Sequence, residues 1–565
     1  MRLERIELTN YRSFGPGTTI IEFPDQENIV ALVGANNAGK SNLLSAVRLA
    51  LGGGRRDAGD PSDFHQLDIT QELRVDLILR QPIKRENIYR KVDVIQGFYF
   101  RAHRGERGAE KGQVKTENYC LDEAGQTYRP AAALRRRSGP PDPDAEPVRF
   151  LPAPASRIVP LLGRVHYLSP SLYRAFDTSG YGILAQLLDL YRDDFRSDAN
   201  TYEVPASGEI VTRAAAFDRL AARMGEVLRT EKLTEIEQSL SDNLRVVLGP
   251  NAAGAEVTIA LPTAEELLAE VLSLRVQDDG ASPALSVNRL GDGYRSLLRL
   301  AIMRTYADLA ADDQPAVFLI EEPEAYLNPH LRRFFAGTLH KLAELGNDVL
   351  VTTHDAAFVS LPAYPTVIRI AKRGASSHGY RCTAALDFSY EKLAQKLRRG
   401  GNSEVFFAAK AILCEGQDDV AAVRALLDRR GGDPDAFNIS VLDCGGRENL
   451  PDYLRLLDEL HIDAFVITDG DASKIQDNDS TAKNVAAVEA AAAGRLFRFS
   501  EDIETALGTE KRGRGENLVH LVTVVETLDS DRLSAGSEIG SCIAALEAFC
   551  RPASHGASDA KVPSA

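Results

Sequence analysis

Three short stretches of the sequence hold residue types that can act on phosphates. Residues 34–41 read GANNAGKS, the G-x-x-x-x-G-K-[ST] pattern that surrounds the phosphates of a nucleotide. Residues 415–419 (EGQDD) and 469–471 (DGD) hold closely spaced carboxylates, which suit a hard cation such as Mg²⁺. The sequence therefore predicts a nucleotide site and a metal site, and each needs strands and helices to hold it.

The glycine-rich stretch has the context that a phosphate-binding loop requires. Residues 29–33 predict a buried strand before it, and residues 42–51 predict a helix after it. Glycine lets backbone N–H groups approach the phosphates, and the helix N-terminus adds a positive dipole. Lys40 is expected to reach the β- and γ-phosphates, and Ser41 to hold Mg²⁺. The expected nucleotide-binding positions of this loop are Gly34, Asn37, Gly39, Lys40, Ser41 and Asn42.

Two later apolar runs end in residues that an ATPase needs. Residues 317–320 (VFLI) predict a buried strand that delivers Glu321 and Glu322 at its C-terminal end. We expect Glu321 to support Mg²⁺ and Glu322 to polarise the attacking water. Residues 348–353 predict another buried strand, and His354 at its end is expected to sense the γ-phosphate.

The other carboxylates also follow predicted strands. Glu415 and Asp419 come after one short apolar run, and Asp469 and Asp471 come after another. Because the C-terminal ends of parallel strands meet at one edge of a sheet, these acids are expected to converge. Two Mg²⁺ or Mn²⁺ ions about 4 Å apart could then hold a scissile phosphate between an attacking water and a leaving oxygen. Glu415, Asp469 and Asp471 are therefore expected to be catalytic as well as metal-binding.

Length and composition limit the classes of protein. A chain of 565 residues exceeds what one hydrophobic core supports, so several domains are expected. The net charge of −15 does not indicate nucleic-acid binding, so a DNA enzyme must gather Lys and Arg locally. Residues 80–107, 135–137 and 392–399 hold such clusters, although any one of them is more readily explained as a solvated face.

The sequence also predicts a cellular compartment. No apolar run approaches the roughly 20 residues of a membrane helix, and the start of the chain has no secretory segment. The six cysteines show no CxxC pairing and are expected to be reduced thiols. We therefore expect a cytoplasmic protein without a membrane partner.

Taken together, the motifs resemble a known family. MRLERIELTNYRSF followed by GANNAGKSN is similar to the opening of RecF/SMC-type ATPases. IEEPEAYLNPH is similar to the Walker B and D-loop of the OLD (overcoming lysogenization defect) branch. The Glu-Gly-x-x-Asp and Asp-x-Asp order resembles the Toprim domain of topoisomerases, primases, RecR proteins and OLD nucleases.

The resemblance implies an α/β architecture. It consists of an ABC-type (RecF/SMC-like) ATPase head with a helical dimerisation insert, followed by a Rossmann-like Toprim domain. The implied parts are residues 1–174 and 251–400 for the ATPase, 175–250 for the insert and 401–565 for the Toprim nuclease domain. Apolar residues recur at helical spacing in the insert, a pattern typical of either a core or a dimer surface.

The resemblance also implies further site residues. The glycine-rich turn at residues 290–296 occupies the place of the ABC signature, so Gly291, Gly293, Arg295 and Ser296 would complete the ATP site of a partner protomer. Asp502 and Glu504 look like a later acidic pair of the OLD nucleases, and Lys561 looks like their C-terminal catalytic lysine. The signature departs from LSGGQ and Glu321 replaces the usual Asp, which suggests slow hydrolysis.

The leading hypothesis is an ATP-regulated, metal-dependent DNA endonuclease or nickase in anti-phage defence or DNA repair. ATP and Mg²⁺ are the implied cofactors, with Mn²⁺ or Ca²⁺ able to substitute in the Toprim site. The implied partners are DNA and further copies of the chain, as a homodimer or a dimer of dimers.

Three alternatives stay open. A Gabija-type nuclease subunit would need a UvrD-like helicase. A nucleotide-gated sensor or repair scaffold would bind DNA without cutting, although the complete set of acids argues against it. A topoisomerase would need a nucleophilic tyrosine, and neither Tyr390 nor Tyr453 has a distinguishing context.

Overall fold

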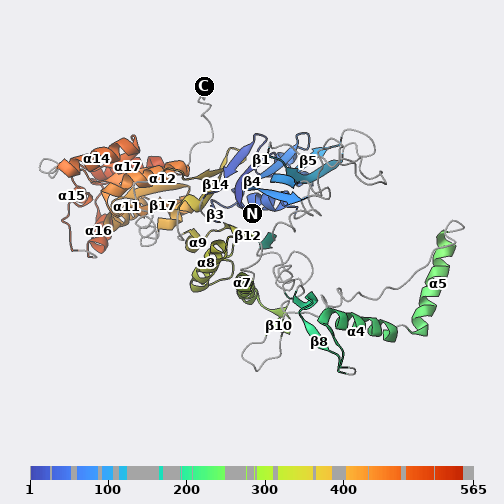
Figure 1. Cartoon of the computed structure of the whole chain (residues 1–565). Coiled ribbons are helices and arrows are strands. Elements are labelled where there is room, and N and C mark those ends of the chain that lie inside the picture. Colours follow the sequence, from blue (N-terminus) through green and yellow to red (C-terminus); the bar gives the residue numbers. More distant parts are fainter. Residues whose placement is uncertain are drawn as a thin grey trace. The chain divides into compact units, whose positions relative to one another are not determined.

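Figure 1 shows the computed structural model of the chain, coloured from blue at the N-terminus to red at the C-terminus. The structure describes residues 2–25, 28–52, 60–86, 92–105, 113–123, 165–168, 191, 194–205, 208–228, 230–248, 275–276, 285–286, 289–309, 316–359, 364–384, 402–430, 432–471, 479–513 and 516–551. The chain divides into two compact units. The first comprises residues 1–165, 314–324 and 328–565, and the second comprises residues 166–313 and 325–327.

The first unit opens with an antiparallel sheet. Its strands, in spatial order, are β2 (Thr19–Glu22), β1 (Leu3–Thr9), β4 (Leu73–Glu86), β5 (Val92–Arg104) and β6 (Val114–Leu121). Leu3, Ile6 and Leu8 are buried on one face of β1, and Ile6 pairs with Leu77 of β4. Apolar and polar residues alternate along β1, which is why one of its faces is buried and the other is half-buried.

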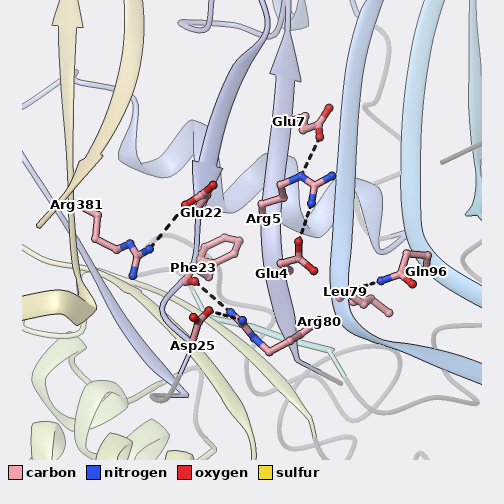
Figure 2. A network of polar contacts seen from close by, with 10 residues as sticks. All are labelled: Glu4, Arg5, Glu7, Glu22, Phe23, Asp25, Leu79, Arg80, Gln96 and Arg381. Carbon is pink, nitrogen blue, oxygen red and sulfur yellow. Dashed lines mark hydrogen bonds and ion pairs between the residues drawn. The ribbon is translucent and has the colours of Figure 1, made fainter. Parts of the chain in front are cut away.

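Polar side chains form short-range contacts on this sheet and with the segments beside it. Figure 2 shows these contacts, which involve Glu4, Arg5, Glu7, Glu22, Phe23, Asp25, Leu79, Arg80, Gln96 and Arg381. Arg80, the first arginine of the basic stretch at residues 80–107, pairs with Asp25 and also donates to the carbonyl oxygens of Phe23 and Pro24. Its positive charge is thus used within the sheet, as on a solvated face. The clusters at 135–137 and 392–399 lie outside the described residues.

The second sheet of this unit carries the strands that precede the nucleotide motifs. The strands β15 (Ser376–Arg381), β14 (Val367–Arg373), β3 (Ile29–Val33), β13 (Asp348–Thr352) and β12 (Val317–Glu321) lie in this spatial order. All pairs except β14–β15 are parallel, and every residue of β3 and β13 is buried. The parallel strands end at the same edge, where sequence motifs place chemistry.

Helices continue the chain from this edge. They are α1 (Lys40–Ala50), α8 (Pro329–Glu344) and the short α9 (Ala356–Val359). The helix expected after the phosphate loop is confirmed, and it begins at Lys40 itself. Asn328 caps α8 by accepting a hydrogen bond from the Leu331 N–H, and Pro329 occupies the first helical position, so both residues favour a helix start here.

A third sheet forms the C-terminal part of the unit. Its strands are all parallel and lie in the order β17 (Ile439–Asp443), β16 (Lys410–Cys414), β18 (Asp463–Thr468) and β19 (Leu496–Arg498). The helices around it are α11 (Gln417–Arg429), α12 (Leu450–Glu459), α14 (Asp479–Ala492), α15 (Ile503–Leu507), α16 (Glu516–Thr527) and α17 (Glu538–Cys550). The Rossmann-like alternation predicted for this region is confirmed.

The two parallel sheets of the first unit are joined by direct contacts. Arg369 of β14 is buried and donates to the carbonyl oxygens of Leu460 and His461 at 3.0 and 2.7 Å. The same guanidinium donates to the carbonyl oxygen of Ala408 at 3.2 Å, just after the 3-10 helix η9 (Asn402–Phe407). These bonds fix β14 to the third sheet.

The second unit corrects part of the helical expectation for the insert. Its elements are β7 (Val165–Leu168), which begins it, β8 (Thr201–Glu203), β9 (Ile210–Thr212), α4 (Arg213–Leu228), α5 (Glu231–Leu248), β10 (Arg275–Val276), β11 (Leu285–Ser286) and α7 (Asp292–Leu309). β8 and β9 pair as an antiparallel hairpin, so residues 201–212 are not helical. Their aromatic and β-branched residues favour strands, and Pro205 and Gly208 favour the turn between them.

The apolar stripe of the insert is exposed within this chain. The side chains at helical spacing in α4 and α5 are Leu220, Met224, Val227, Ile236 and Leu240, each at least 40% exposed. Leu184 and Leu188, which begin the pattern, lie outside the described residues. The core interpretation is therefore wrong for α4 and α5, and the dimer-surface interpretation stays a proposal.

Two further features concern the cysteines and the hydropathy of the helices. All six cysteines are free thiols, as predicted from their spacing. None of the helices in the described ranges is both long and apolar enough to cross a bilayer.

The remaining short helices are the 3-10 turns η1 (Pro61–Asp63), η2 (His65–Leu67), η8 (Tyr364–Thr366), η10 (Asp435–Phe437) and η11 (Arg447–Asn449).

Candidate functional site

The loop between β3 and α1 can be built only with glycine at two positions. Gly34 has a φ of 134°, and a Cβ there would lie 2.1 Å from the carbonyl oxygen of Ile370 in β14. Gly39 has a φ of 111°, and a Cβ there would lie 2.7 Å from the hydroxyl oxygen of Ser377. The loop is thus packed tightly against β14 and β15, which holds its backbone N–H groups in place.

Lys40 lies folded against the same loop. Its Nζ donates to the carbonyl oxygens of Gly34 and Ala35 at 2.9 and 3.0 Å, and the side chain is buried. Burial lowers the pKa of Lys40, and the carboxylates of Glu322 and Glu324 partly restore it. The ammonium therefore stands where a phosphate-binding lysine must be, next to two acids of the Walker B segment.

The other expected loop residues lie around Lys40. Ser41 and Asn37 are exposed, and Asn37 has a left-handed φ of 60°. Asn42 donates from its side chain to the Ser13 hydroxyl at 2.9 Å. Gln66 is exposed in η2 with a φ of 51°. Lys40, Asn42 and the glycines are thus held by contacts of their own.

The Walker B acids follow β12 as expected. Glu321 is the last residue of the strand and is half-buried. Glu322 is exposed and has a φ of 42°, and its N–H donates to the Thr352 carbonyl oxygen at 2.9 Å. This bond ties the turn after β12 to the end of β13, so Glu322 and His354 follow the ends of two adjacent strands.

Glu324 has a role that the sequence did not indicate. Its carboxylate accepts hydrogen bonds from the Thr353 hydroxyl at 2.9 Å and from the His354 N–H at 2.6 Å. Burial raises the pKa of Glu324, and these two donors lower it in part. Glu324 thus positions the backbone that carries His354.

His354 faces the nucleotide loop and the C-terminal part of the unit. Burial lowers its pKa, Lys40 lowers it further, and Glu322 acts in the opposite sense. The charges of Lys40 and Glu322 therefore both act on His354, as expected if the three side chains serve one site. The His354 ring also stacks on Phe407 of η9, with centroids 6.3 Å apart and planes inclined by 30°.

The signature-like residues belong to the second unit. Gly291 is exposed just before α7 begins, and Gly293 is exposed in its first turn. Ser296 is buried, and its hydroxyl donates to the Ala325 carbonyl oxygen at 3.3 Å. Arg295 is half-buried, and its N–H donates to the Gly291 carbonyl oxygen. Their action on a partner protomer stays a proposal.

The acids of the third sheet converge as the strand order predicts. Glu415 follows β16 and Asp469 follows the adjacent β18. Oε1 of Glu415 accepts from the Thr468 hydroxyl at 2.6 Å and from the Asp469 N–H at 3.0 Å. Asp419, in the first turn of α11, accepts from the Gly416 N–H at 2.9 Å. The ends of two strands and the start of one helix therefore hold acids in one place.

Burial and the mutual repulsion of neighbouring carboxylates raise the pKa values of two acids in this cluster. The pKa of Asp469 is raised to about 8, first by burial and then by Asp419 and Glu415. Burial followed by the Glu415 charge raises the pKa of Asp419 to about 7. Carboxylates held together in this way at partly buried positions call for a cation, which is how catalytic metal sites are built.

The DGD turn is locked to the segment that carries the later acidic pair. A Cβ on Gly470 would lie 2.1 Å from the Phe499 carbonyl oxygen, so only glycine fits. The N–H groups of Gly470 and Asp471 both donate to the Glu501 carbonyl oxygen, at 2.7 and 3.0 Å. Asp471 itself has a φ of 47°. This packing brings residues after Glu501 beside the cluster.

Asp502 and Glu504 lie near the other acids but are used differently. Asp502 caps α15 by accepting from the Thr505 N–H at 2.8 Å. Glu504 is buried, and both acids contribute to the raised pKa of Asp469. Glu504 is thus buried close to the cluster, while Asp502 caps α15, and their role as metal ligands stays a proposal.

Three site residues were missed by sequence reasoning. Arg447 pairs with Glu415 and Asp471, and Lys511 lies 3.6 Å from Glu504. Asn517 is fully buried and donates to Glu504 at 2.8 Å and to Asp418 at 3.0 Å. The position of Arg447 after a strand and two glycines was a usable signal. The sequence around Lys511 and around Asn517 holds no comparable signal for a site residue.

The donor set fits a divalent cation. Carboxylate oxygens are hard ligands, and the cluster carries the excess negative charge that such an ion would neutralise. Within the ranges that the structure describes, however, no three Asp, Glu, His or Cys side chains lie in an arrangement ready to hold a metal ion. Lys561 lies outside the described residues.

Comparison with known proteins agrees with this arrangement. Residues 29–360 match the family described as "AAA domain, putative AbiEii toxin, Type IV TA system". The chain belongs to this AAA-domain family. Residues 406–471 of this AAA-domain protein match the "Overcoming lysogenization defect protein-like, TOPRIM domain" model, so the resemblance to the OLD family is confirmed.

Two curated relatives span most of this AAA-domain protein. An OLD nuclease of Thermus scotoductus is 24% identical over 93% of this chain and 95% of its own length. The Old nuclease of Escherichia phage P2 is 20% identical over 83% of this chain and 77% of its own. An SMC head bound to the winged-helix domain of ScpA aligns with 70% of this chain and 100% of its own at 16% identity, but its TM-score is 0.35. The fold class therefore rests on the family models and the sheets, which confirm an ATPase domain followed by a Toprim domain.

Proposed function

We propose that this protein is an ATP-regulated endonuclease that cuts or nicks DNA with divalent metal ions held by the Toprim acids. The observation that carries the proposal is the cluster of Glu415, Asp419 and Asp469 at adjacent strand ends, with two raised pKa values. Metal ions there would supply the nucleophilic hydroxide and neutralise the phosphate. The names of the two curated relatives support nuclease chemistry.

The residues of the cluster have distinct proposed roles. Glu415, Asp419, Asp469 and Asp471 would hold the metal ions, with Glu504 as a further ligand. Thr468 and the Asp469 N–H orient Glu415, because both donate hydrogen bonds to its Oε1. Mg²⁺ or Mn²⁺ is the proposed ion, because each ligand is a carboxylate.

The ATPase site would control cutting through contacts within the first unit. His354, which shares the environment of Lys40 and Glu322, stacks on Phe407. Phe407 ends η9, β16 begins three residues later at Lys410, and Glu415 follows the last residue of that strand. If His354 moves when ATP binds or is hydrolysed, the movement would therefore displace Phe407 and the start of β16, the strand that precedes the proposed metal ligand Glu415.

Other parts of the proposal concern assembly and role in the cell. We propose a homodimer in which the α4 and α5 stripe and the signature residues of one copy serve another. A cytoplasmic role in anti-phage defence or DNA repair is consistent with the family. The domain limits 1–174, 175–250, 251–400 and 401–565 belong to the same proposal.

The test is cleavage of supercoiled plasmid by the purified full chain. Reactions with Mg²⁺, Mn²⁺ or EDTA, each with and without ATP, are followed on agarose gels. Nicked or linear product that requires the metal supports the proposal, and the ATP lanes give the sign of regulation. If no metal or nucleotide condition yields product, an autonomous nuclease is excluded.

Lys511 is expected to bind the scissile phosphate. It is exposed on its loop, yet its pKa is raised by Glu504, Asp419, Asp469 and Asp418 against the effect of burial, so it faces the cluster. Lys511→Ala should lower kcat/KM for a labelled duplex about 100- to 1,000-fold, since the loss of one preorganised donor to developing phosphate charge costs on this order. Lys511→Arg, which keeps the charge, should lose less.

Two further variants complete this measurement. Lys483→Ala removes an exposed lysine from α14 of the same domain and should leave cleavage unchanged. Lys561→Ala tests the lysine that the sequence predicts. Wild-type cleavage by Lys511→Ala together with loss in Lys561→Ala would assign the role to Lys561 and remove it from Lys511.

A further inference from the structure

A buried arginine lies among the acids of the Toprim sheet. Arg447 begins η11, and its side chain is only 8% exposed. Its Nε donates to Oε1 of Glu415 at 2.9 Å. Its Nη2 lies 2.8 Å from Oδ2 of Asp471 and donates to the Asp469 carbonyl oxygen at 2.9 Å. One guanidinium therefore contacts three of the positions that are proposed to surround the metal.

The backbone around Arg447 is fixed by other bonds. The Cys444 N–H donates to the Cys414 carbonyl oxygen at 2.9 Å, and the Gly446 N–H donates to the Glu415 carbonyl oxygen at 2.8 Å. The Asn449 side chain donates to the Cys444 carbonyl oxygen at 2.9 Å. These bonds tie the turn to the end of β16 without using the arginine side chain. The side chain is thus free to serve the acids and is not needed to form the turn.

The guanidinium divides the acids into two sets. Burial alone would lower the pKa of Arg447, but Glu415 and Asp471 together raise it, so both are neutralised by a permanent cation. Asp419 and Asp469, in contrast, are dominated by burial and by neighbouring carboxylates. Glu415 and Asp471 thus form ion pairs with the guanidinium, whereas the opposing positive charge near Asp419 is that of Lys511.

We propose that Arg447 is a positioning residue that acts as the resident counter-cation of the metal site, and that a divalent metal must compete with it for Asp471. The inference rests on the divalent metal use proposed above. The guanidinium of Arg447 cannot lose its proton at neutral pH, so its positive charge always competes with the metal. Such a residue would keep the acids together before metal binds and would lower the apparent affinity for the ion that needs Asp471.

A purely structural ion pair makes a different prediction. If Arg447 only anchored the turn, its removal would lower stability equally with and without metal. If Arg447 is a counter-cation, its removal lowers stability mainly when the metal is absent. When the metal is bound, the metal itself neutralises the acids. The dependence of the stability loss on metal therefore separates the two roles.

The experiment compares full-length wild type with Arg447→Gln in EDTA and in saturating Mn²⁺. We expect the Tm of the variant to fall by roughly 5 °C or more in EDTA, because an uncompensated charge is left in the cluster. At saturating Mn²⁺ less than half of this loss should remain. Free Mn²⁺ counted by electron paramagnetic resonance should give a Kd about tenfold lower in the variant, because no guanidinium has to be displaced.

Two variants control the measurement. Arg495→Gln removes the bidentate pair of Arg495 with Asp458 in the same domain, at 2.6 and 2.9 Å, and should lose the same Tm in EDTA and in Mn²⁺. Arg447→Lys keeps the charge but not the fork, so it should lie between wild type and Arg447→Gln. If Arg447→Gln does not fold, Arg447→Lys carries the test alone.

The outcomes are distinct from those of the nuclease proposal. Equal Tm losses with and without Mn²⁺, together with an unchanged Kd, would overturn the role of Arg447. Tighter Mn²⁺ binding and a metal-reversible Tm loss support it even if the wild type cuts no DNA, in which case only the nuclease proposal fails.

Discussion

Replacing Asp469 by asparagine is expected to abolish most DNA cleavage and at the same time to stabilise the metal-free protein. The rate should fall at least about 100-fold, because even the loss of an outer partner of a metal ligand costs 10- to 100-fold. Stability should rise because the carboxylate is partly buried beside Asp419 and Glu415, which repel it. An amide of the same shape removes that repulsion.

The pH dependence of stability follows from the same group. The pKa of Asp469 is about 8 in the folded protein, well above the value of about 4 in an unfolded chain. The folded state thus binds this proton more tightly, so the contribution of Asp469 to stability is fully present below about pH 4 and is lost as the pH rises through about 8. Asp419, with a pKa of about 7, acts with the same sign.

The measurement is Tm in EDTA at pH 5, 6, 7 and 8. Wild type should lose several degrees across this range, and Asp469→Asn should lose less, with the largest difference at pH 8. Asp348, whose pKa is about 7 through burial in the other parallel sheet, contributes to both proteins, so the difference isolates Asp469. Mn²⁺ should reduce the pH dependence of wild type, since metal replaces the protons.

A matched control comes from the same strand. Asp463 is the first residue of β18 and is exposed at the end opposite to Asp469. Asp463→Asn should cut DNA like wild type and keep its pH profile. Wild-type cleavage by Asp469→Asn, or a Tm for the variant below that of wild type at pH 8, would show that Asp469 is not part of a repelling metal cluster.

Replacing Lys40 by methionine is expected to remove ATP hydrolysis. The rate should fall about 100-fold or more, as when a preorganised cation is taken from developing phosphate charge. In the structure the Nζ is already held over the loop by the carbonyl oxygens of Gly34 and Ala35, with Glu322 and Glu324 near it. Methionine fills the same space but leaves no positive charge for the phosphates.

Nucleotide binding gives a second measurement that does not depend on turnover. ATP with Mg²⁺ at about 100 times its Kd should stabilise wild type by about 2.7 kcal/mol, and the resulting rise in Tm should be largely absent from Lys40→Met. Lys341→Met, on the exposed side of α8, should keep both hydrolysis and the Tm rise. An unaltered Tm rise in Lys40→Met would mean that nucleotide binds elsewhere.

The same variant reports on regulation. If ATP changes plasmid cleavage by wild type, Lys40→Met should cut at the rate of the nucleotide-free enzyme whether or not ATP is present. A variant that still responds to ATP would contradict a path that starts at the phosphate loop and passes through His354 and Phe407.

Local motifs were determined by the sequence alone. The phosphate loop needs a strand, a glycine turn and a helix in immediate succession, and residues 29–50 supply them within one short segment. The same holds for the acids after β12, β16 and β18, since a short apolar run identifies a buried strand and its end. The hairpin at residues 201–212 was missed because its strands are only three residues long.

Only the tertiary structure decided which distant side chains complete the sites. Strand β16 lies between β17 and β18, and this order brings Arg447 from the end of β17 to Glu415 and Asp471. Asn517, 99 residues after Asp418, reaches that acid because α16 packs on α11. Periodicity and propensity report what each segment becomes, but a contact between segments depends on the order and register of strands, and no local pattern encodes that order.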